Sequence, residues 1–128
     1  MIFLVDTHLV LWVANEPKRL SAAARKELID PANQLWFSAA SLWEIAIKQQ
    51  NSRKDFDVDA RLLRRGLLDN GWTELAVSSA HGLATLDLPL LHKDPFDRML
   101  VAQAHVEGAT LLTSDRIVAR YPGAIRKV

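Results

Sequence analysis

The sequence contains no cysteine in its 128 residues. Disulfide bonds, cysteine-ligated metal sites and thiol catalysis are therefore excluded. Long hydrophobic runs are also lacking. The apolar stretch at residues 2–5 has no basic segment before it and is broken by Asp6. This pattern fits neither a signal peptide nor a membrane-spanning segment, and it predicts a cytoplasmic protein.

The chain also has no marked excess of charge of either sign, since it contains 16 Lys and Arg and 15 Asp and Glu. A dedicated nucleic-acid-binding protein is usually basic overall, so any polyanion would have to be guided by local charge. Apolar residues make up 49% and charged residues 24%, which is typical of a folded globular domain and excludes disorder. The length predicts a single domain over residues 1–128.

Short apolar runs alternate along the chain with longer helical patterns. We predict strands at 2–5, 34–37, 73–77 and 110–112, with a small edge strand at 124–125. Helices are predicted at 9–14, 22–30, 39–50, 60–69, 79–86, 96–107 and 117–121, and residues 51–57 form a loop or an exposed helix extension. The alternation predicts an α/β fold with a parallel sheet covered on both faces. In such sheets the functional site lies beyond the carboxyl ends of the strands.

Four carboxylates are predicted to lie at that edge. Asp6 directly follows the first strand, and Asp115 follows the 110–112 strand after two hydroxyl residues. Glu44 lies one turn into the helix that leaves the second strand. Asp97 lies in the first turn of the 96–107 helix.

Each acid has an ordinary explanation when taken alone. Asp6 and Asp115 can cap helices, Asp97 suits a helix dipole, and Glu44 can pair with Lys48. These separate explanations do not account for the convergence of all four acids, because clustered carboxylates repel one another unless a cation neutralises them. Hard oxygen ligands suit Mg²⁺ or Mn²⁺, and such an ion can activate water to attack a phosphodiester.

The segments around these acids carry a resemblance to a known family. They are Asp6-Thr7, Ser41-Leu42-Trp43-Glu44-Ile45, the string HKDPFDRMLVAQA at 92–104, and Leu112-Thr113-Ser114-Asp115. In this order they resemble the PIN domain, and more narrowly the VapC-type toxins of bacterial toxin–antitoxin pairs. The resemblance covers essentially the whole chain. It implies a three-layer α/β/α fold around a central parallel sheet and Mg²⁺- or Mn²⁺-dependent endoribonuclease activity on RNA.

The resemblance also implies roles for particular residues. The catalytic and metal-binding acids would be Asp6, Glu44, Asp97 and Asp115. Thr7 and Ser114 would steady the site through hydrogen bonds. Asp94 is expected to be the N-cap of its helix, with a contact to an outer-shell water as the alternative.

Several basic groups near these acids are candidates for substrate binding. Arg98 and Arg116 either contact phosphate or point to solvent, and Lys48 either contacts substrate or neutralises Glu44. We favour His92 as a substrate contact over a zinc ligand, because no histidine pair has metal-ligand spacing. A further basic run either forms a solvated face, which we favour, or contacts the RNA backbone: Lys48, Arg53, Lys54, Arg61, Arg64 and Arg65.

The resemblance implies two protein partners: a cognate antitoxin, whose tail lies in an apolar groove beside the active site, and a second copy in a homodimer. Candidate residues for these surfaces, if they do not pack in the core, are Trp12, Trp43, Leu63 and Leu67. The alternative function is a catalytically silent PIN fold that binds RNA or docks on a protein. Divalent-metal binding distinguishes the two readings, since a pure docking module has no need of a metal.

Overall fold

The computed structural model describes residues 1–51 and 56–128, and within them five strands form one parallel sheet. The strand order is β3-β2-β1-β4-β5. The strands are β1 (Ile2–Val5), β2 (Gln34–Ser38), β3 (Thr73–Leu75), β4 (Thr110–Thr113) and β5 (Ile125–Lys127). The predicted α/β fold with a central parallel sheet is confirmed.

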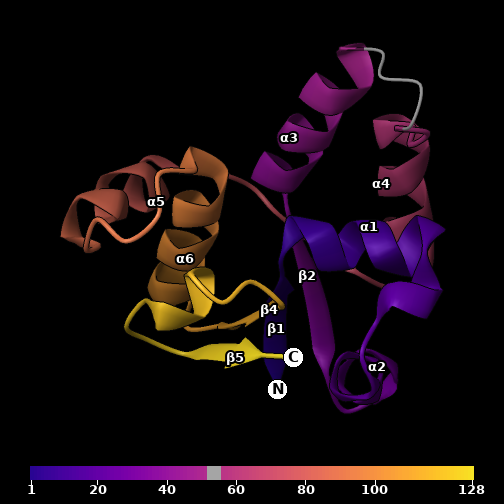
Figure 1. Ribbon diagram of the computed structural model, residues 1–128, viewed down its shortest axis with the longest axis horizontal. Coiled ribbons are helices and arrows are strands. Elements are labelled where there is room, and N and C mark those ends of the chain that lie inside the picture. Colours follow the sequence, from indigo (N-terminus) through magenta and orange to yellow (C-terminus); the bar gives the residue numbers. More distant parts are fainter. Residues whose placement is uncertain (52–55) are drawn as a thin grey trace.

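Helices connect the strands and cover both faces of the sheet (Figure 1). They are α1 (Thr7–Asn15), α2 (Ala22–Ile29), α3 (Ala39–Gln50), α4 (Ala60–Asp69), α5 (Ser79–Ala84) and α6 (Pro95–Glu107). Short 3₁₀ turns lie at Pro17–Arg19, Thr85–Asp87 and Val118–Arg120. The last of these replaces the helix predicted at 117–121. Helix α1 begins two residues earlier than predicted, because Asp6 itself is its N-cap.

Successive residues of the central strands point to opposite faces of the sheet, and this builds two separate cores. Phe3 and Val5 of β1 pack with residues of α1, α3 and α4 on one face. Leu4 lies between them in sequence but packs with α6 on the other face. Figure 1 shows the corresponding layers, with α5 and α6 on one side of the sheet and α1 to α4 on the other.

A buried polar contact ties α6 to the junction between β2 and α3. Gln103 is fully buried, and its Oε1 accepts a 2.6 Å hydrogen bond from the Ser38 hydroxyl. The same hydroxyl accepts the Ala40 N–H at 3.0 Å and caps α3. One side chain therefore fixes both the start of α3 and its position against α6.

The strand order changes direction between β1 and β4, and this is where ligands bind in open α/β sheets. Val5, the last residue of β1, pairs with Leu112 of β4. Asp6, which follows β1, therefore lies beside Thr113, the last residue of β4. In the described part of the chain, no helix is long and apolar enough to cross a membrane.

Replacing Leu112 by alanine tests the importance of the central strand pair. Leu112 is fully buried in the larger core, so Leu112→Ala should lower the free energy of unfolding by about 2–5 kcal/mol. Ile29→Ala is the matched control, because Ile29 is 78% exposed and its loss should cost less than about 0.5 kcal/mol. Urea unfolding measures both, and equal values for the two variants would contradict the assignment of Leu112 to the core.

Candidate metal centre

Asp6 lies at the carboxyl end of β1 and is almost completely buried, with 4% of its surface exposed. Its Oδ1 accepts the N–H of Leu9 at 3.0 Å, which caps α1. Its Oδ2 accepts a short hydrogen bond from the hydroxyl of Thr113. The carboxylate is thus held rigidly by both elements that flank the switch point.

Asp115 is tied to the same threonine. The Asp115 N–H donates to Thr113 Oγ1 at 3.0 Å, so one hydroxyl orients both Asp6 and the turn after β4. The Oδ1 of Asp115 accepts the N–H groups of Ile117 and Val118 at 2.7 and 3.1 Å. These bonds leave Asp115 Oδ2 directed to the site.

His92 lies against two of the acids. Its Nε2 is 3.2 Å from Asp97 Oδ2 and 3.9 Å from Asp115 Oδ2. The ring Nδ1 accepts the Asp94 N–H at 3.1 Å, so the proton of a neutral ring is on Nε2 and faces the carboxylates. One ligand atom from each of His92, Asp97 and Asp115 lies within 4.8 Å of the others.

Glu44 enters the site from α3 and is 9% exposed. Its Oε2 is 3.5 Å from Lys48 Nζ, one turn further along the helix. Its Oε1 is buried and has no hydrogen-bond partner among the described residues. A buried carboxylate oxygen without a partner costs free energy, which indicates that Glu44 is placed for a ligand.

Burial and like charge raise the pKa of two of the acids. Burial, together with the carboxylates of Asp94, Glu44 and Asp6, raises the pKa of Asp97 to about 7 against the lowering effect of His92. Burial is also the main reason that the pKa of Asp6 is raised, and the Asp115 carboxylate adds to it. All four predicted acids therefore interact electrostatically in one region.

These residues fit a divalent cation. Four carboxylates supply the hard oxygen ligands that Mg²⁺ or Mn²⁺ prefers, and the unpartnered Glu44 Oε1 is an oxygen ready to coordinate. A cation would also offset the carboxylate repulsion that, after burial, contributes to the raised pKa of Asp97. Among the described residues, the ligand atoms that lie within 4.8 Å of one another belong to His92, Asp97 and Asp115. Asp6 and Glu44 interact electrostatically with Asp97, so these five residues could hold the cation.

The three predicted supporting residues, Thr7, Ser114 and Asp94, have different roles in the structure. Thr7 donates to Ser41 Oγ at 2.8 Å and joins α1 to α3 inside the protein. Among the described residues, the hydrogen bonds at the turn after β4 are made by Thr113 rather than by Ser114. Asp94 is the N-cap of α6, where its Oδ1 accepts the Phe96 N–H at 2.8 Å.

Arg98 is directed away from the acids. Its guanidinium donates to the carbonyls of Pro89 and Thr85 and to the hydroxyl of Tyr121, at 2.8, 2.9 and 3.1 Å. The same tyrosine hydroxyl accepts the N–H of His92 at 2.9 Å. Arg98 thus fixes the loop that carries His92 and acts on the site only through that loop.

The other cations predicted near the site are spread over the surface. Lys48 is in place beside Glu44, and Arg116 is exposed. In the predicted basic run, Arg64 pairs with Glu74 at 2.7 Å, and Arg53 and Lys54 lie outside the described residues.

Two residues of the site were missed by sequence reasoning. Thr113 and Ser41 are buried hydroxyl residues that orient Asp6 and Thr7. Thr113 could have been preferred over Ser114 only by knowing that β4 extends one residue beyond 112, so that Thr113 stays in the sheet beside Asp6.

A model of the PIN-domain family matches residues 3–124, which is nearly the whole chain. The chain belongs to the PIN-domain family. It is of the VapC type: Ribonuclease VapC22 of Mycobacterium tuberculosis is 30% identical over 113 residues, which cover 88% of this chain and 86% of the relative. The predicted family is thereby confirmed.

Solved structures share the fold of this PIN domain. VapBC2 from Rickettsia felis, bound to a DNA fragment from its promoter, matches with a TM-score of 0.73 and 18% identity over 99% of this chain and 98% of the other. DNA-bound VapBC from Salmonella typhimurium matches with a TM-score of 0.67 and 15% identity over the same shares. These likenesses confirm the three-layer architecture.

The raised pKa of Asp97 predicts that stability of the metal-free chain falls as pH rises. Between the ordinary value of 3.8 and about 7, the folded chain holds a proton that the unfolded chain has released. The free energy of unfolding should therefore fall by at most about 1.4 kcal/mol per pH unit from about pH 4 to about pH 7, and level off above that. Thermal unfolding in excess chelator measures this, and Mn²⁺ should raise the melting temperature more at the higher pH.

Asp97→Asn is the matched variant, because it removes the titrating group and should flatten the pH profile. An unchanged profile in this variant would show that another group causes the dependence. If Mn²⁺ raised the melting temperature equally at the low and the high end of this pH range, binding of the cation by deprotonated acids would be contradicted.

Removing the Thr113 hydroxyl should loosen Asp6 and Asp115 together. Thr113→Val keeps the shape of the side chain but leaves Asp6 Oδ2 and the Asp115 N–H without this partner. The free energy of unfolding should therefore fall by about 1–3 kcal/mol. Divalent-cation affinity, measured by calorimetry, should fall by about 10- to 100-fold. Thr113→Ser retains the hydroxyl and should stay close to wild type, whereas equal losses in both variants would assign the effect to the methyl group.

Proposed function

We propose that this PIN domain is a divalent-metal-dependent endoribonuclease and the toxin of a toxin–antitoxin pair. The observation that carries the proposal is the electrostatic coupling of Asp6, Glu44, Asp97 and Asp115 at the carboxyl edge of the sheet, with the buried Oε1 of Glu44 lacking a hydrogen-bond partner among the described residues. The 30% identical relative supports it, since that protein is named a ribonuclease.

In this mechanism the four acids would hold Mg²⁺ or Mn²⁺, and Thr113 keeps Asp6 and Asp115 in position. A bound cation would supply charge neutralisation at the phosphodiester and a lowered pKa for water. His92 directs its Nε2 proton to the carboxylates of Asp97 and Asp115, and it would donate instead to a phosphate oxygen of RNA bound there. Lys48 pairs with Glu44 and is the cation next to it that would contact the RNA backbone.

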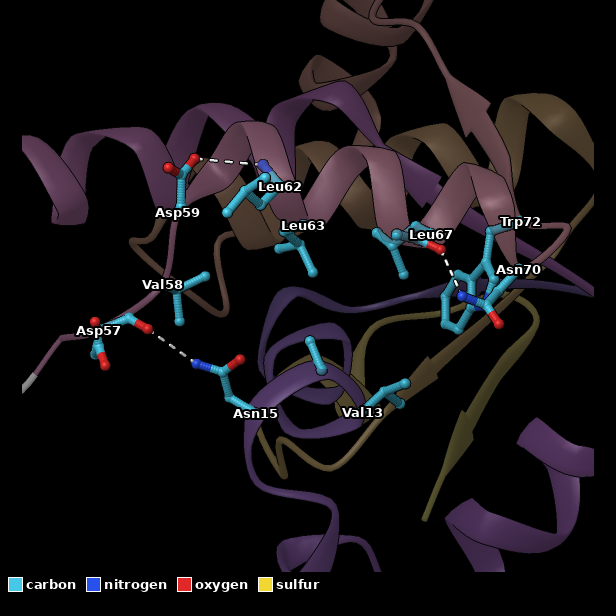
Figure 2. A pocket seen from close by; sticks show the side chains of 12 residues that line it. Val13, Asn15, Asp57, Val58, Asp59, Leu62, Leu63, Leu67, Asn70 and Trp72 are labelled. Atoms are coloured by element: carbon cyan, nitrogen blue, oxygen red, sulfur yellow. Dashed lines mark hydrogen bonds between the residues drawn. The ribbon is translucent and has the colours of Figure 1, made fainter.

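A cognate antitoxin is the proposed protein partner, and the two structural neighbours described above are VapBC assemblies. Figure 2 shows a groove between α1 and α4, with a volume of about 700 Å³. Leu63 and Leu67 lie on its α4 side, and Val13 and Trp72 complete its apolar lining. Leu63, Leu67 and Trp72 pack in the core, and the four acids are not among the lining residues, so this groove differs from the one predicted beside the active site. We assign an apolar segment of the antitoxin to this groove.

We also propose a homodimer and a cytoplasmic location. Leu83, Leu86 and Leu90 are 65%, 81% and 90% exposed on the segment from α5 to the loop before α6. Exposed leucines on neighbouring turns favour burial against a second copy. The cytoplasm is where an RNA-cleaving protein meets its substrate.

Cleavage of total cellular RNA by the purified chain tests the proposed activity. With Mg²⁺ or Mn²⁺ we expect fragments with 5′-phosphate and 3′-hydroxyl ends, and with excess chelator we expect none. Asp97→Asn should reduce the rate by at least about 100-fold. Asp69→Asn is the matched control, because Asp69 is an exposed acid at the end of α4 and should leave the rate unchanged.

Other outcomes would overturn this assignment. Fragments that end in a 2′,3′-cyclic phosphate would exclude attack by water. A folded chain that neither cleaves RNA nor binds a divalent cation would be a docking module instead. Equal activity in Asp97→Asn would indicate a contaminating nuclease.

A further inference from the structure

Two aromatic side chains form a pair beside the acidic site, with Trp43 exposed and Phe96 half-buried. Trp43 of α3 is 65% exposed, and its ring centroid lies 5.3 Å from that of Phe96 at the start of α6. The ring planes are inclined at 71°. Each aromatic residue directly precedes a site acid, since Glu44 follows Trp43 and Asp97 follows Phe96. The aromatic pair is therefore held by the same two helix turns that present these carboxylates.

Packing within the chain does not account for Trp43. Trp72 is buried in the larger core, and Trp12 and Trp36 pack partly against the two cores, whereas Trp43 joins neither. Ile47, one turn further along α3, is 36% exposed and extends the same apolar surface. An indole left this open to water is costly unless something covers it.

A shallow hollow of about 420 Å³ runs beside Phe96 and Ile47. Its charged lining has both signs, since Lys48 and Lys93 line it together with Asp94 and with Glu44, which pairs with Lys48. Lys93 is exposed, and the Lys48 side chain is 40% exposed. Aromatic faces for bases, next to lysines for phosphates, are the combination with which proteins hold single-stranded nucleic acid.

We infer that the exposed indole of Trp43, held by its edge-to-face contact with Phe96, stacks an unpaired base of the RNA beside the phosphodiester that is cleaved, while Lys48 and Lys93 contact the adjoining phosphates. This inference rests on the proposed ribonuclease function and assigns Trp43 as the residue that holds a base beside the acids. Stacking is tolerant of base identity, so the pair selects unpaired over paired nucleotides rather than one base over another. Duplex RNA keeps its bases stacked on one another and cannot offer one to Trp43.

A second copy of the chain is the competing occupant of this surface. Lysine is depleted at the centres of protein–protein interfaces, and here two lysines line the hollow next to the aromatic pair. The acids lie immediately beside it as well, where a covering protein would exclude the substrate. Both observations favour RNA.

Binding of a fluorescein-labelled single-stranded RNA of mixed sequence, followed by anisotropy in excess chelator, tests the inference. Trp43→Ala should weaken binding by about 5- to 100-fold, and Trp43→Phe should restore most of the affinity. The dependence of affinity on salt should stay unchanged in Trp43→Ala and become shallower in Lys93→Ala, because only lysine contacts phosphate. Ile29→Ala, a loss of an exposed apolar side chain on α2, should bind as wild type does.

RNA cleavage and sedimentation of the same variants distinguish failure of the stacking inference from failure of the proposed ribonuclease function. If the wild type cleaves and binds RNA but Trp43→Ala binds equally well, the stacking inference is wrong and the ribonuclease function stands. If Trp43→Ala binds RNA as the wild type does but has a smaller mass than the wild type in sedimentation, a second copy covers the surface. If the wild type neither binds RNA nor cleaves it with Mn²⁺, the proposed function fails and the stacking inference with it. Duplex RNA bound as tightly as the single strand would also overturn the inference.

Discussion

Repulsion among carboxylates at the carboxyl edge of the sheet is the constraint that the surrounding structure has to meet. The chain meets it with fixed donors: the Thr113 hydroxyl and the Leu9 N–H hold Asp6, two backbone N–H groups hold Asp115, and Lys48 lies beside Glu44. Asp97 has His92 as its neighbour, yet its pKa remains near neutrality. Burial is the largest cause of this raised pKa and the neighbouring carboxylates add to it, so the charged form of Asp97 is left disfavoured, and a cation would favour it.

The position of the acids could be predicted from sequence because each follows a recognisable strand or helix start. Asp6 comes directly after an apolar run and Asp115 follows another after two hydroxyl residues, and parallel strands bring such residues to one edge. Asp97 follows an Asp-Pro helix start, and Glu44 interrupts an apolar helix face. These signals lie in short stretches of sequence, so they can be recognised without knowing how the chain packs.

The hydrogen-bonding partners could not be predicted, because they depend on contacts between distant segments. Thr113 was passed over for Ser114 since the choice requires the register of β4 against β1. Arg98 follows a site acid in sequence, but it turns to Tyr121 and to the carbonyl of Thr85, which tertiary packing alone places there. Likewise, Leu63 and Trp43 look alike as apolar helix positions, and only the folded chain shows that one is buried and the other open.

Both edges of the sheet are formed by strands of only three residues, β3 and β5. An edge this short offers few unpaired backbone groups to another chain, and the Arg126 and Lys127 side chains place charge along β5. Sheet-to-sheet aggregation is thereby disfavoured even when no other protein covers the molecule. A chain built in this way can stay dispersed after it separates from a binding partner, which is the interval in which an enzyme held in check by complex formation has to act.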